Sequence, residues 1–71
     1  MRENFKKLLL IMGFYQMPSG NLDKTNEYHY DQFKIYVGQM GWILYFNGKG
    51  IGNEDSFNVK DLFKLMLDHR S

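Results

Sequence analysis

Apolar residues near both ends of the chain recur with the period of an α-helix. At the N-terminal end the spacing i, i+3, i+4 and i+7 is carried by Phe5, Leu8, Leu9 and Met12. One apolar stripe of this kind predicts a helix over residues 3–12. Gly13 follows at the position where helices commonly end in a left-handed residue. This first segment is therefore expected to pack on a core.

The same spacing returns in Val59, Leu62, Phe63 and Met66. Asn58, followed three residues later by Asp61, resembles a capping box with aspartate in place of glutamate. Phe57 and Leu62 occupy the positions of a hydrophobic staple. A second helix is expected to begin at about residue 59.

Between the helices the pattern changes to alternation, which predicts one continuous strand over residues 27–37. One face of this strand would carry His29, Asp31, Phe33, Ile35 and Val37. The other face would carry Tyr28, Tyr30, Gln32, Lys34 and Tyr36. A turn at residues 38–41 and a second strand over residues 42–47 complete an antiparallel hairpin.

The register of this hairpin follows from its apolar residues. Centring the turn on Gln39 and Met40 gives three apolar pairs, namely Val37 with Trp42, Ile35 with Leu44 and Phe33 with Phe46. The same register sets Tyr36 opposite Ile43 and Lys34 opposite Tyr45 on the second face. A slip of one residue would mix the two sets, so the six residues of the apolar pairs are predicted to be core.

Two weaker signals flank the hairpin. Residues 49–52 follow the tight-turn pair Asn47-Gly48 and predict a short, irregular third strand. Residues 18–27 are rich in turn formers and predict a surface loop held by Leu22. The expected fold is therefore a small two-layer α+β domain, with an antiparallel hairpin or three-stranded meander packed by two helices on its Phe33, Ile35 and Val37 face. Phe5, Phe57 and Phe63 are assigned to the same core.

Length and composition narrow the class of protein. A chain of 71 residues with 44% hydrophobic residues, no cysteine and a formal charge of +1 is one folded domain over residues 1–71 with a small core. Balanced charge provides no field that attracts nucleic acid or an anionic membrane from a distance. No membrane partner is expected. The absence of cysteine is compatible with a reducing compartment, and a cytoplasmic location is expected.

The predicted outer face of the hairpin is the candidate binding site. It would consist of Tyr28, Tyr30, Lys34, Tyr36, Ile43 and Tyr45. Tyrosine supplies large contact area at a small entropic cost and tolerates water, as recognition surfaces require. The structural alternatives are ordinary cross-strand stabilisation of a small sheet, or a face covered by a helix or by residues 14–26. Leu10, opposite the first helical stripe, is a further candidate contact.

The leading functional hypothesis is a non-enzymatic protein-binding module that binds a protein partner or forms a homodimer. Small, aromatic-rich phage and mobile-element proteins that inhibit host machinery share this size and composition, which is an analogy only. The alternative is single-stranded nucleic-acid binding by base stacking on the same face. It has less support, because that face carries only one lysine, Lys34.

Catalytic, metal and cofactor sites are not expected. Gly48-Lys49-Gly50-Ile51-Gly52 lacks the Gly-Lys-Ser/Thr ending of a phosphate loop and does not lead directly into a helix. His29 is interpreted as a strand-end histidine paired with Asp31, and His69 is distant in sequence. Ser19 and Ser56 have no nucleophile-elbow motif.

The basic and apolar order at the N-terminus also fits a signal peptide or a weak membrane-surface helix. Arg2, Lys6 and Lys7 precede the apolar run of residues 8–12, but no small-x-small cleavage site follows before Pro18. The apolar stripe is better explained by core packing. A structural helix is therefore expected.

Overall fold

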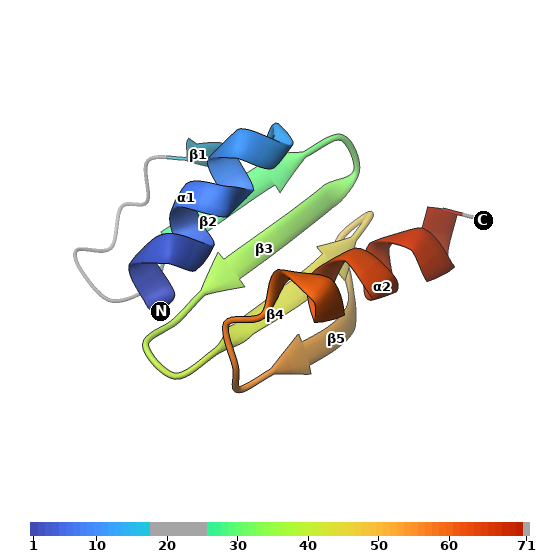
Figure 1. Ribbon diagram of the computed structural model, residues 1–71. Helices are drawn as coiled ribbons and strands as arrows, with labels where there is room; N and C mark the ends of the chain where they lie inside the picture. Colours follow the sequence, from blue (N-terminus) through green and yellow to red (C-terminus); the bar gives the residue numbers. More distant parts are fainter. Residues whose placement is uncertain (18–25, 71) are drawn as a thin grey trace.

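The computed structural model describes residues 1–17 and 26–70 (Figure 1). Within them the chain forms two helices and five strands. In order these are α1 (Arg2–Met12), β1 (Tyr15–Met17), β2 (Asn26–Tyr30), β3 (Phe33–Val37), β4 (Trp42–Phe46), β5 (Lys49–Glu54) and α2 (Val59–Arg70). The predicted loop over residues 18–27, with Leu22, lies mostly outside the described residues, and its last two residues belong to β2.

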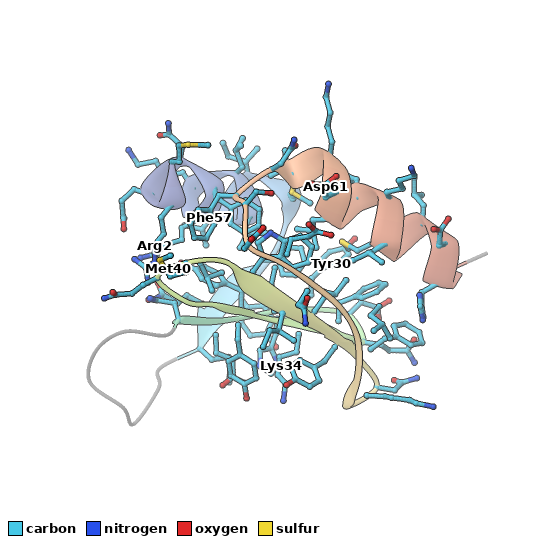
Figure 2. All side chains as sticks on the ribbon, turned by 90° about the horizontal axis from the view of Figure 1, so that it is seen from below. Arg2, Tyr30, Lys34, Met40, Phe57 and Asp61 are labelled. Carbon is cyan, nitrogen blue, oxygen red and sulfur yellow. The ribbon has the colours of Figure 1, made fainter. Side chains whose placement is uncertain are left out.

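The strands form one antiparallel sheet in the order β1-β2-β3-β4-β5, and each strand pairs with its neighbours in sequence. Both helices lie on the same side of this sheet (Figure 2). In Figure 1, α1 lies in front of β2, and α2 runs beside β4 and β5. The predicted two-layer α+β class is confirmed. The meander has five strands because β1 is added and the strand predicted over residues 27–37 divides into β2 and β3.

The predicted register of the central hairpin is confirmed. Val37 pairs with Trp42, Ile35 with Leu44 and Phe33 with Phe46. The third strand predicted at residues 49–52 is also present and extends to Glu54 as β5. A register shift opposite Leu44 and Tyr45 leaves Ile51 as an extra residue in β5, which explains the irregular pattern of this segment.

The predicted single strand over residues 27–37 is wrong. The chain reverses at Asp31 and Gln32, where Asp31 adopts a positive φ of 56°, and β2 then pairs with β3. Aspartate tolerates this left-handed conformation better than most residues. Tyr30 therefore lies opposite Phe33, and Tyr28 lies opposite Ile35. Directly opposed residues share a sheet face, so both tyrosines move to the helix-covered side.

The core lies between the helices and this inner side of the sheet. The ring of Phe5 on α1 stacks on Trp42 with centroids 6.0 Å apart and also contacts Phe57. Phe14 is buried although the sequence pattern did not mark it. Phe63 was assigned to the core but is exposed, because its side of α2 faces the space between the helices rather than the sheet.

The end of α1 and the start of α2 lie where the sequence predicts them. Gly13 has the left-handed φ of 110° expected of a C-terminal cap. At α2 the backbone N–H of Lys60 donates to Asn58 Oδ1 at 2.9 Å, which confirms Asn58 as the N-terminal cap. Arg2 Nε donates to the carbonyl oxygen of Gly38 at 2.7 Å and so ties the start of α1 to the end of β3.

Candidate functional site

Four of the six predicted site residues share the side of the sheet that the helices leave uncovered. Lys34 and Tyr36 come from β3, and Ile43 and Tyr45 come from the facing positions of β4. Figure 2 shows Lys34 pointing away from both helices. The other two, Tyr28 and Tyr30, are corrected to the inner side: Tyr28 is only 1% exposed and belongs to the core, and Tyr30 packs against it.

Lys34, Tyr36 and Tyr45 form a compact cluster. The two tyrosine rings meet edge to face, with centroids 5.5 Å apart and planes at 88°. The Lys34 Nζ atom lies 5.2 Å from the Tyr36 ring centroid and 5.3 Å from that of Tyr45. Cation–π contacts at exposed sites contribute about 0.5–1 kcal/mol each. The lysine head group is therefore held in place, which lowers the entropic cost of using it in a contact.

Strands β1 and β2 add residues that the sequence analysis missed. Tyr15 is opposite His29, and their rings lie 5.9 Å apart. His29 Nε2 contacts Glu27 Oε2 at 2.5 Å, so the carboxylate beside His29 is Glu27 and not the predicted Asp31. We define the outer face as Tyr15, Glu27, His29, Lys34, Tyr36, Ile43 and Tyr45. Recognising Asp31-Gln32 as a turn would have placed Glu27 and His29 there, whereas the three residues of β1 carry no comparable signal.

Two of these residues are strongly accessible. Tyr15 is 55% exposed and Ile43 is 41% exposed, while Tyr36 and Tyr45 are half-buried. The half-buried rings contact each other and Lys34, so part of their surface is already used within the sheet. The outer face therefore combines an ordered aromatic centre with accessible apolar groups on its β1 and β4 strands.

An open hollow continues the outer face beyond the end of the central hairpin. It has a volume of about 780 Å³, and Tyr36 and Ile43 form part of its wall. The exposed Met40 lies at the turn, and Glu54 and Asp55 lie on the β5 side. Among the described residues, the charged lining residues of the hollow are Glu54 and Asp55, and Arg2 lies beside it through its hydrogen bond to Gly38. The β5 side of the hollow is therefore acidic, in contrast to the centre of the outer face, where Lys34 lies.

The corrected strand assignment weakens the nucleic-acid hypothesis. Base stacking was expected on the whole predicted face, and two of the four tyrosines of that face, Tyr28 and Tyr30, belong to the inner side. Among the described residues, Lys34 is the one lysine or arginine of the outer face, and Glu27 lies on the same face. Phosphate binding depends chiefly on clustered cations, which this face does not offer.

The part of the chain that the structure describes brings together no set of side chains with the composition of a metal site. Within residues 1–17 and 26–70, no three histidine, aspartate or glutamate side chains are grouped as metal ligands. His69 contacts the Phe46 ring, with centroids 5.8 Å apart. Neither helix is long and apolar enough to cross a membrane.

Comparison with known proteins finds none that is similar to this chain. No protein-family model matches it, and no curated protein or solved structure shows significant similarity. Any functional inference therefore depends on the chain's own surfaces.

The buried position of Tyr28 predicts a pH dependence of stability. Burial raises the pKa of its phenol above 10.0, and the nearby Glu3 carboxylate adds to the shift while Arg2 opposes it. The folded state thus holds this proton more tightly than the unfolded chain does. The stabilisation is complete below pH 10 and is lost as the pH rises through the folded-state pKa.

Urea unfolding between pH 8 and pH 11 checks this prediction. The free energy of unfolding should decrease more steeply above about pH 10 in the wild type than in Tyr28→Phe, which cannot ionise. The other tyrosines contribute equally to both proteins. Parallel curves would show that Tyr28 does not carry the dependence.

Proposed function

We propose that this chain is a non-enzymatic protein-binding module whose outer face contacts a protein partner. The observation that carries the proposal is the ordered Lys34, Tyr36 and Tyr45 cluster on a sheet face that neither helix covers. Tyrosine and a pre-positioned cation are typical of interface centres. A cytoplasmic location is proposed with it, because a cysteine-free chain suits a reducing compartment.

The charges predict what the partner presents. Lys34 at the centre favours a carboxylate of the partner, whereas Glu54 and Asp55 at the adjoining hollow favour a lysine or arginine. Ile43 and Met40 line the hollow together with Tyr36 of the aromatic cluster, and both are exposed and supply apolar contact. A matching partner surface therefore carries both signs of charge around an apolar centre.

The double variant Tyr36→Glu with Tyr45→Glu tests the proposal. Two carboxylates in place of two rings remove the apolar contact and repel an acidic group aimed at Lys34, so affinity for the partner should fall at least about tenfold. The partner is first captured from the native host by the wild-type protein and identified by mass spectrometry. Its affinity for each purified variant is then measured by calorimetry.

Two variants control this experiment. Leu10, the further candidate contact, is exposed on α1 and so lies on the other side of the sheet from the outer face. Leu10→Glu makes the same kind of change there and should leave affinity unchanged. Ile43→Glu affects the outer face at an exposed position and should reproduce the loss if the double variant fails to fold. Circular dichroism monitors folding. Equal affinity of the partner for wild type and Ile43→Glu would contradict the proposal.

The two remaining hypotheses give different results. Single-stranded nucleic-acid binding predicts an affinity for oligonucleotides at low salt that falls steeply as salt is added. A homodimer through the outer face predicts a concentration-dependent mass in sedimentation that Ile43→Glu abolishes. Either result would show that the outer face binds nucleic acid or a second copy of the chain instead of a different protein.

A further inference from the structure

An apolar groove lies on the other side of the molecule, between the two helices. It encloses about 220 Å³ and is lined by Met12, Phe14, Tyr30, Phe63, Met66 and Leu67. In Figure 1 the helices cover different strands, and β3 is visible between them. The groove thus has one wall from α1 and the residues after it, and one wall from α2.

The rims of the groove expose more apolar surface than its lining alone suggests. On α1, Ile11 is 80% exposed, and Leu8 lies one turn before Met12 on the same side. On α2, Leu67 is 66% exposed and Phe63 lies one turn before it. Leu8 and Ile11 on one rim and Phe63 and Leu67 on the other are all exposed, and exposed apolar side chains gathered around a groove commonly mark an interaction site.

The charges next to the groove are basic. Lys7 is one turn before Ile11, Lys60 is three residues before Phe63, and Lys64 is three residues before Leu67. All three lysines are exposed, and none forms an ion pair within the described residues. Glu3 lies one turn before Lys7, where it pairs with Arg2 and Lys6, and Asp68 lies one turn after Lys64. Asp61 lies on the side of α2 opposite Phe63. The lysines beside the groove therefore outnumber the carboxylates in the same rows.

The shape of the groove and the charges beside it together indicate which kind of partner it binds. We propose that the groove binds an amphipathic helix of a protein partner whose apolar stripe is flanked by acidic residues. A second copy of the chain would bring its own Lys7, Lys60 and Lys64 against the same lysines, which is unfavourable. An acidic helix instead neutralises them while its apolar side chains enter the groove.

The side chains of the groove fit one side of such a helix. The lining spans the end of α1 with Phe14 and the turn of α2 from Phe63 to Leu67, and the exposed Leu8 and Ile11 extend the apolar surface along α1 by about one turn. Anchors at i, i+4 and i+7 of a partner helix lie within about 10 Å along its axis. Met12 and Met66 line the groove, and their flexible thioether side chains adapt to anchors of different shape. This proposal does not depend on the outer face.

Two synthetic peptides of equal length provide the test. One carries leucine at i, i+4, i+7 and i+11 with glutamate at flanking positions, and the other has lysine at every glutamate position. Binding to the full-length ¹⁵N-labelled protein is measured by amide chemical-shift titration at low ionic strength. The acidic peptide should bind at least about tenfold more tightly, with the largest shifts at Ile11, Phe63 and Leu67.

Variants then locate the site. Leu67→Glu should weaken the acidic peptide at least about tenfold, because it removes an anchor contact and repels the glutamates. The double variant Lys60→Glu with Lys64→Glu should bind the lysine peptide more tightly than the acidic peptide. Leu10→Glu is the matched control on the far side of α1 and should change nothing. The double variant Tyr36→Glu with Tyr45→Glu should bind the acidic peptide as tightly as the wild type does. Failure of the outer-face proposal is therefore distinguished from failure of this one.

Four outcomes would overturn the proposal. The first is equal binding of both peptides, and the second is binding of the acidic peptide that Leu67→Glu does not weaken. The third is a homodimer in sedimentation that Leu67→Glu abolishes, which would assign the groove to a second copy of the chain. Failure of the acidic peptide to bind at millimolar concentration would likewise remove the groove as a helix-binding site.

Discussion

Tyr28→Ala is expected to cost about 3–5 kcal/mol of unfolding free energy, whereas Tyr36→Ala is expected to cost about 1–2 kcal/mol, the value of its contacts with Tyr45 and Lys34. Tyr28 is fully buried opposite Ile35 and its removal leaves a cavity in the core. Tyr36 lies on the outer face, where solvent fills the space that its ring leaves. A domain of this size has a total stability of about 4–10 kcal/mol, so the first variant approaches global unfolding.

Urea unfolding followed by circular dichroism measures both variants. The comparison also tests the reversal of the chain at Asp31 and Gln32, because a continuous strand would put Tyr28 and Tyr36 on one face and give them similar costs. Similar costs would therefore contradict the pairing of β2 with β3. Tyr28→Phe provides a reference that keeps the ring and removes the hydroxyl group.

The contrast between Tyr28 and Tyr36 shows which strand pairings can be predicted from sequence patterns and which cannot. The β3–β4 register was predictable, because three apolar pairs opposed each other in only one alignment. The strand before it was not, because alternation through Tyr28, Tyr30 and Lys34 is equally regular whether or not the chain turns at Asp31. A two-residue turn reverses the face of every residue before it, and only pairing with a neighbouring strand decides between the two arrangements.

The candidate site was predictable to the same extent. Lys34, Tyr36, Ile43 and Tyr45 belong to the well-specified hairpin, and they share the outer face as expected. Tyr15 reaches that face through β1, a strand of three residues whose sequence has no alternation long enough to detect. The exposure of Phe63 was also unpredictable, since helical spacing marks an apolar side without showing what covers it.

Gly41→Ala is the second substitution with a large expected effect. A Cβ atom at this position would overlap the backbone carbonyl oxygen of Glu54 and lie 2.7 Å from the Asp55 Cα atom. Both obstacles are backbone atoms at the end of β5, so no side-chain rotation relieves the clash. Gly41 also accepts a 2.8 Å hydrogen bond from the Gly38 N–H through its carbonyl oxygen, which closes the turn between β3 and β4.

The expected cost of Gly41→Ala is about 2–4 kcal/mol, because the end of β5 must separate from the start of β4. Gly38→Ala is the matched control in the same turn. Its Cβ atom would approach the Gly41 carbonyl oxygen at 3.5 Å, an ordinary contact, and its backbone φ is not positive. Its unfolding free energy should stay within about 0.5 kcal/mol of the wild type. Since Gly41 also lines the acidic hollow, a stable Gly41→Ala variant would mean that β4 and β5 are farther apart there and that the hollow has a different shape.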